Sequence, residues 1–265
     1  MIWRRFKENA RVVLAAFELT VKQSFTDSFV LFGILVQPLI IAILGIWMLK
    51  ERGGDYGIFV VVGSGMTGLW TNLVFMSGNS ITEERWTGTL EFLVAQPTPI
   101  QWVIFGKNLA SVLQSLLSML GSYVLAALIF NLSLEMAHPF YFAISLILGV
   151  ISFICFGLVI APVFVMNPSV QRWQNSMEYP IYILCGFLFP IALLPGWTTP
   201  LSYLLSPYWA AHALHGASSG TLTFSEFALS WFMMLLFSAI YLVISQKLFR
   251  VMLRKARIDA TLIGQ

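Results

Sequence analysis

The sequence has few charged residues, and this shortage argues against a water-soluble domain. Only 10% of its 265 residues are Asp, Glu, Lys or Arg, whereas 58% are hydrophobic and the mean hydropathy is +0.82. Soluble domains carry roughly 25% charged residues. The composition therefore predicts an integral membrane protein without a soluble region long enough to fold alone.

The sequence also lacks the motif with which many ATPases hold phosphate. No Gly-x-x-x-x-Gly-Lys-Ser/Thr loop occurs: Gly106-Lys107 comes nearest, but Gln101 stands where the first glycine belongs and Asn108 follows the lysine. We therefore expect the chain to bind no nucleotide cofactor and to be no enzyme. The glycine pattern in residues 63–68 lies within an apolar helical run, so we interpret it as a close-packing surface and not as a dinucleotide site.

Cysteine is scarce, and the patterns of potential ligands are incomplete. Cys155 and Cys185 both lie in apolar runs, which favours buried small side chains over disulfide or ligand roles. His212 and His215 have a ligand-like spacing, but Glu226 is the only acidic residue near them, so we predict no metal site. The net charge of +3 is too small and scattered to indicate nucleic acid.

The charges that are present are clustered, which leaves long uncharged stretches. These run over residues 28–49, 56–82, 108–134, 136–171, 179–225 and 227–246. A transmembrane helix needs about 20 apolar residues. The pattern predicts an all-α membrane protein with six transmembrane helices, near residues 29–49, 58–81, 103–130, 140–166, 179–194 and 227–248.

One transmembrane domain is expected over residues 1–265, with 28–249 as the six-span bundle. Residues 1–27 are predicted to form an interfacial amphipathic helix, because apolar and charged residues recur on separate faces at helical spacing. The apolar face contains Trp3, Phe6, Ala10, Val13, Phe17 and Val21; the charged face contains Arg4, Glu8, Arg11, Glu18 and Lys22. Residues 250–265 form a basic tail suited to anionic lipid headgroups.

The distribution of basic residues predicts the orientation. If both termini are cytoplasmic, only Lys50 and Arg52 of the 15 Lys and Arg residues lie outside, which leaves 15 − 2 = 13 inside. This agrees with the positive-inside rule. The segment between the second and third spans is then cytoplasmic, and the proline-rich stretch before the last span is external.

That cytoplasmic segment, residues 82–97, is a charged island between two apolar runs. Trp86, Leu90 and Leu93 share one helical face, and Glu84, Gly88 and Glu91 share another, which indicates a short amphipathic helix before the stop at Pro97. On spacing alone, a solvated loop with ordinary surface charges is an equally good interpretation. The candidate contact residues are Glu83, Glu84, Arg85, Thr87, Gly88, Thr89, Leu90, Glu91 and Pro97.

The second candidate region is uncharged and broken by proline. One straight helix is impossible over residues 179–225, so we expect a fifth span to about Leu194 and then short segments that re-enter the outer face. Its marker residues are Pro190, Pro195, Trp197 and Pro207. Tyr203, Tyr208 and Trp209 are predicted to form an aromatic belt at that interface.

Glu84-Arg85, Gly88-Thr89-Leu90-Glu91 and Pro97 resemble the coupling segment of type 2 ABC export permeases, and Pro190 to Pro207 resemble that family's outer re-entrant helices. The resemblance implies a bacterial inner-membrane permease whose coupling helix docks into an ATP-binding subunit. It further implies two permeases, alike or related, and two ATPase copies that carry the ATP and Mg. Membrane lipids are the other expected partners.

The resemblance also implies the function: ATP-driven export of a hydrophobic or amphiphilic compound, such as a drug, an antibiotic or a lipid-linked molecule. Two alternatives stay open. One is a polysaccharide exporter of the same family, and the other is a six-span scaffold or sensor that recruits a cytoplasmic partner without transport.

Overall fold

The fold is known from a computed structural model, which describes residues 2–26, 36, 39–45, 47, 57–89, 92–93, 98–130, 136–167, 178–188 and 190–258. Within these residues the secondary structure is entirely helical, as the sequence predicts. Its main helices are α1 (Ile2–Thr26), α3 (Gly57–Trp86), α5 (Ile100–Phe130), α6 (Pro139–Met166), α9 (Ser206–Ser219) and α10 (Phe224–Ile258).

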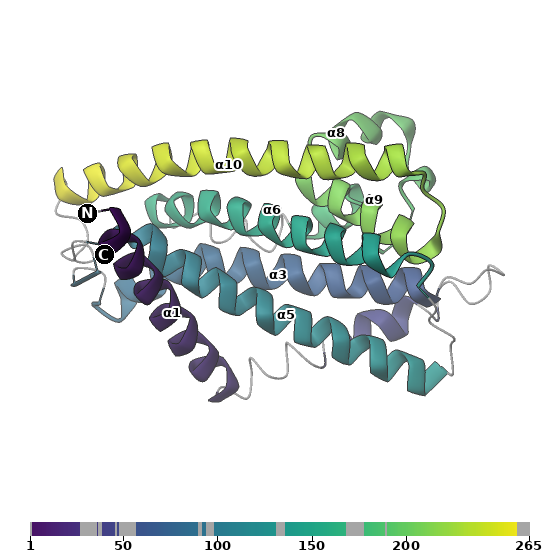
Figure 1. Cartoon of the computed structure of the whole chain (residues 1–265), viewed down its shortest axis with the longest axis horizontal. Helices are drawn as coiled ribbons and strands as arrows, with labels where there is room; N and C mark the ends of the chain where they lie inside the picture. Colours follow the sequence, from purple (N-terminus) through teal and green to yellow (C-terminus); the bar gives the residue numbers. More distant parts are fainter. Residues whose placement is uncertain are drawn as a thin grey trace.

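The long helices α3, α5, α6 and α10 form a bundle, and shorter elements gather at one of its ends (Figure 1). These elements are η2 (Ile191–Leu193), η3 (Gly196–Thr198), α8 (Thr199–Tyr203) and α9. Helix α1 begins at the other end, where α3 and α10 finish and α5 starts. The two candidate regions therefore lie at opposite ends of the bundle.

Three helices in the described part of the chain are long and apolar enough to cross a membrane. The qualifying stretches are Ile100–Gly121 in α5, Pro139–Met166 in α6 and Phe224–Lys255 in α10. These correspond to the third, fourth and sixth predicted spans. The first predicted span, residues 29–49, lies largely outside the described residues. Within it, residues 39–45 are described and are helical.

The predicted end of the fifth span is wrong. The helix over residues 178–184 stops ten residues before Leu194. Gly186 has a φ of 69°, and Phe187 N–H donates to the Tyr182 carbonyl at 3.2 Å while Gly186 N–H donates to Ile183. This hydrogen-bond pattern with a left-handed glycine is a Schellman stop, so the glycine ends the helix before Pro190 is reached.

Small side chains let α3 approach its neighbours closely, as the interpretation of residues 63–68 requires. A Cβ on Gly63 would lie 1.8 Å from the Phe187 carbonyl oxygen, and one on Gly65 would lie 2.4 Å from Met119 of α5. In the same interface Asn72 donates to Ser115 at 2.9 Å. Ser115 of α5 thus serves helix packing.

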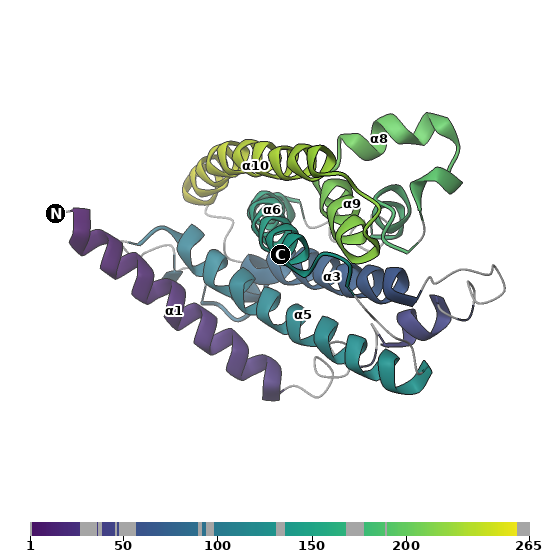
Figure 2. The ribbon, with the colours of Figure 1, turned by 45° about the vertical axis from the view of Figure 1, so that its right-hand side comes forward.

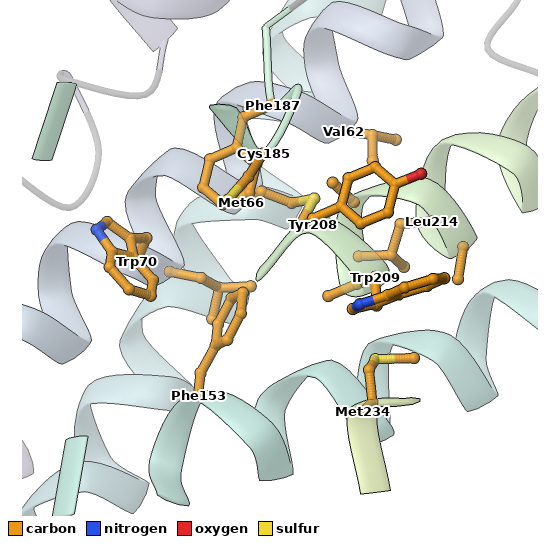
Figure 3. Close-up of a cluster of buried hydrophobic side chains, with 14 of the residues drawn as sticks. Val62, Met66, Trp70, Phe153, Cys185, Phe187, Tyr208, Trp209, Leu214 and Met234 are labelled. Carbon is orange, nitrogen blue, oxygen red and sulfur yellow. The ribbon is translucent and has the colours of Figure 1, made fainter. Parts of the chain in front are cut away.

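The main core lies between α3, α6, α9 and the turn after residue 184. Figure 3 shows its buried side chains, including Met66, Trp70, Phe153, Phe187 and Trp209. Cys185 belongs to this core, and both Cys185 and Cys155 are free buried thiols, in agreement with the sequence interpretation. The proline-rich stretch is consequently anchored to the bundle through a continuous apolar core.

Helix α1 packs along α5 and, from residue 8 onward, has the predicted division into faces; the side chains of Trp3, Arg4 and Phe6 lie outside the described part. A Cβ on Gly106 of α5 would lie 2.5 Å from the Val13 carbonyl oxygen, so the glycine permits close contact between the two helices. Val13 and Phe17 are partly buried, whereas Glu18 and Lys22 are exposed and form an ion pair at 2.7 Å. Exposed Leu14 and Phe25 leave further apolar surface suited to a membrane interface.

Candidate functional site

The first candidate region begins on the last turn of α3, which ends in a second Schellman stop. Gly88 has a φ of 72°, and Thr89 N–H donates to the Glu84 carbonyl at 2.9 Å. Leu93 N–H then donates to the Thr89 carbonyl at 3.1 Å, which opens a new helical turn. The helix that contains the predicted second span therefore continues past residue 81 to Trp86, and a sharp turn follows it directly.

Glu84 is the centre of the polar contacts at this turn. One carboxylate oxygen accepts from Lys107 Nζ at 2.7 Å, and the other accepts from the Thr89 hydroxyl. Lys107 Nζ also donates to the Ser80 carbonyl at 3.3 Å. Only 14% of the Lys107 side chain and 22% of the Glu84 side chain are exposed. The pair thus ties the end of α3 and the following turn to α5.

The surroundings of Glu84 keep it ionised. Partial burial raises the pKa of its carboxyl, but hydrogen bonds from Lys107 and Thr89, together with the charge of Lys107, outweigh burial and hold the pKa below its ordinary value. Glu84 is therefore a carboxylate at neutral pH. Thr87, Gly88 and Thr89 beside it are exposed, and the two threonine hydroxyls are hydrogen-bonded to Glu84.

The structure brings together only part of the predicted contact set. Glu83, Glu84 and Arg85 lie on the last turn of α3, and Thr87 to Thr89 form the turn after it. Leu90, Glu91 and Pro97 lie outside the described residues, so their assignment stays a prediction. Leu93 packs beside the second hydrophobic cluster, which includes Ile81 and Ile104.

Sequence reasoning missed two residues that the structure connects to α3. Lys107 lies within a predicted span, and a charge there is a signal for a buried partner. Glu178 stands just before an uncharged run and carries no such signal; its carboxylate accepts from Thr71 of α3 and from Tyr182. Each of these charges joins α3 to a different helix.

The second candidate region forms a cap over the opposite end of the bundle. Pro190 and Pro195 precede η2 and η3, and Pro207 lies in the first turn of α9, where a missing N–H costs no helical hydrogen bond. The side chain of Trp197 is 72% exposed. Short helices separated by prolines therefore replace a single straight span, as predicted.

The predicted aromatic belt is wrong for two of its three residues. Tyr203 is exposed, but Tyr208 and Trp209 are 8% and 7% exposed and belong to the core. Trp209 Nε1 donates to the Tyr203 carbonyl at 3.0 Å, and the rings of Tyr203 and Trp209 stack at 5.6 Å. Tyr208 and Trp209 face inward because α9, which carries them, lies against α6 and α10.

Three helices of the bundle are long and apolar enough to cross a membrane. A polar turn lies at one end of the bundle and a proline-rich cap at the other. These features define the class as a helical membrane protein. The family model of the ABC-2 type transporters matches residues 11–218. These residues reach from α1 to the end of α9 and include both candidate regions. The chain therefore belongs to the ABC-2 type transporter family. No curated protein matches the chain.

Membership makes the chain the membrane-embedded permease subunit of an ABC transporter. Such a subunit normally lacks the ATPase motif, and the family implies an ABC ATP-binding partner in general. The permease needs a surface on which that partner can act. The turn after α3 is the candidate for this contact surface.

Proposed function

We propose that this permease belongs to an ATP-driven exporter and that residues 82–97 couple it to the ATP-binding subunit. The observation that carries the proposal is the Glu84–Lys107 pair at 2.7 Å. It links an exposed turn to the ends of two long helices, so a force applied to the turn acts on both. A loop that only carried solvated charges would need no such attachment.

The location of the turn supports the same function. It lies at the end of the bundle where α1 begins and α10 finishes (Figures 1 and 2). Basic Lys247, Arg250, Arg254 and Lys255 lie on the last part of α10. The positive-inside rule assigns that end to the cytoplasm, where an ATPase operates, and assigns the proline-rich cap to the outer face.

The proposed assembly pairs two permeases with two ATP-binding subunits in the bacterial inner membrane. Each permease has six spans and cytoplasmic termini, and ATP and Mg are held by the ATPase subunits. ATP binding and hydrolysis move the turn after α3, and the substrate leaves between the two permeases. A hydrophobic or amphiphilic substrate suits spans that contain many aromatic residues and few charges.

The test is to purify the tagged permease from its native membrane in mild detergent, identify the proteins that accompany it, and measure ATP hydrolysis by the complex. We expect a stoichiometric ABC ATPase in the wild-type preparation. Glu84→Lys places a second cation opposite Lys107 and is expected to remove the ATPase or its hydrolytic activity.

Glu18→Lys is the matched control, because it makes the same substitution in an exposed ion pair on α1. It should retain both the ATPase and its activity. A permease that is purified alone, and that cannot be reconstituted with an ATPase encoded beside it, would refute the proposed function and favour a scaffold.

A further inference from the structure

A cavity of about 730 Å³ lies under the proline-rich cap. It is bounded by the start of α3, the turn at residues 185–186, the segments 190–199, and α9. Its volume is in the range of small-molecule pockets, roughly 300–1,000 Å³. The elements that line it lie at the end of the bundle opposite the turn after α3 (Figure 1).

The lining of this cavity is largely apolar and contains no Asp, Glu, Lys or Arg among the described residues. Ile58, Ile191 and Leu222 contribute aliphatic surface, and Phe59 and Tyr208 contribute rings. A charged ligand would lose its hydration here without gaining a counter-charge. The cavity therefore selects an uncharged molecule with an apolar body.

Two histidines supply polar groups to the same wall. His215 is only 8% exposed and stacks on Phe59 at 3.7 Å. Its Nε2 faces the Phe187 carbonyl at 3.2 Å, and since a carbonyl only accepts, Nε2 carries the proton. Its Nδ1 has no hydrogen-bond partner in the described part of the chain, an arrangement that is rare for a buried polar atom.

The neighbouring His212 also has one ring nitrogen engaged by a protein contact. Its Nδ1 is 3.2 Å from Ser230 of α10, so its Nε2 is the ring nitrogen left for a ligand. One nitrogen of each ring is thus held by a protein contact, and both histidines line the cavity. Pre-oriented polar groups within an apolar wall are typical of a ligand site.

We propose that this cavity binds an uncharged amphiphile whose apolar body fills the pocket and whose hydroxyl or amide group hydrogen-bonds to the His212–His215 wall. Such a molecule is either a compound handled by the transporter or a neutral membrane lipid. The site goes beyond the proposed coupling function and does not depend on it, because binding needs no ATPase.

The experiment uses a photoreactive diazirine analogue of 1-decanol with the full-length permease complex in lipid nanodiscs, without ATP. Labelled peptides are identified by mass spectrometry. We expect saturable labelling at the cavity lining, with competition by 1-decanol. Decylammonium and decyl sulfate have the same chain with a charged head, and they should compete at least about tenfold less well.

Three variants test the position of the site. Ala192→Trp puts a large ring into the cavity from an exposed position and should abolish labelling, whereas Leu193→Trp, the adjacent exposed residue outside the lining, should leave it unchanged. His212→Phe keeps the ring but removes the hydrogen bond, and should weaken competition by decanol about tenfold. Circular dichroism checks that each variant keeps its helix content.

Labelling that does not saturate, that persists in Ala192→Trp, or that charged and uncharged competitors reduce equally would overturn the proposal. Native mass spectrometry of the purified complex separates the two ligand sources. A retained neutral lipid displaced by decanol assigns the site to the membrane, and stimulation of ATP hydrolysis by decanol assigns it to a transported compound. Loss of the ATPase alone would leave the labelling result intact.

Discussion

At the scale of single residues, Glu84 holds the turn after α3 in place through contacts of both its side chain and its backbone. Its two carboxylate oxygens engage Lys107 and Thr89, while its backbone carbonyl accepts the hydrogen bond that ends α3. One residue therefore fixes both the ion pair and the helix stop. A change in its charge is expected to alter the direction in which the exposed turn leaves α3.

The first residue-scale prediction concerns pH. Because the folded-state pKa of Glu84 lies below its ordinary value of 4.5, its stabilising effect is complete above that value and is lost as pH falls through the lower, folded-state pKa. At pH 7, Glu84→Gln should lower stability by roughly 1.5–3 kcal/mol, since it removes a hydrogen-bonded charge. The difference in melting temperature from wild type, measured between pH 7 and pH 3, should shrink at the acidic end. A difference that grows there would contradict the assignment.

The second prediction concerns Gly88, whose φ of 72° disfavours any residue with a Cβ. Gly88→Ala should cost about 1–2 kcal/mol through backbone strain alone, because its Cβ would meet no atom within 4 Å. Gly196→Ala is the control, since that site is equally open but has no positive φ. The melting temperature and the binding of the ATPase should both decrease in Gly88→Ala and stay unchanged in Gly196→Ala. Equal behaviour of the two variants would show that the turn is not constrained.

At the scale of elements, helix stops decide where the functional segments lie. The same device ends α3 at Gly88 and the helix over residues 178–184 at Gly186. In the first case the chain turns into the proposed coupling segment, and in the second it turns into the proline-rich cap. In both candidate regions a glycine in the left-handed conformation thus redirects the chain.

The element-scale prediction tests the contact between α3 and the second of these turns. Gly63→Ala would place a Cβ 1.8 Å from the Phe187 carbonyl oxygen, so the two backbones must separate. The cost should reach or exceed the upper end of about 1–3 kcal/mol for overpacking. Gly149→Ala, with its nearest atom at 3.2 Å, should be milder. Melting temperatures of the two variants measure the difference, and a reversed order would be incompatible with the packing described.

At the scale of the whole molecule, the two ends of the bundle are predicted to lie on opposite sides of the membrane. With Cys155 and Cys185 replaced by alanine, Leu193→Cys should react with an impermeant thiol reagent on intact cells. Thr87→Cys should react only after the membrane is opened. Both positions are exposed, so accessibility is decided by sidedness. Labelling of both cysteines in intact cells would contradict the proposed topology.

Much of this architecture is predictable from the sequence, because uncharged runs and proline positions report directly on membrane helices and their interruptions. The third, fourth and sixth predicted spans match α5, α6 and α10. The ion pair of Glu84 with Lys107 is not predictable, since the two residues are 23 positions apart and meet only when α3 packs on α5. The burial of Tyr208 and Trp209 likewise depends on where α9 docks.

The most direct test of the central claim is a charge-swap cycle on the Glu84–Lys107 pair, read out as ATP hydrolysis by the purified complex. Each single variant, Glu84→Lys and Lys107→Glu, leaves two like charges in contact and should lose most of the coupled activity. The double variant restores opposite charges at the same distance and should recover a substantial part of it. If the double variant is as impaired as the singles, or if neither single variant has an effect, the pair does not link the turn to the two helices.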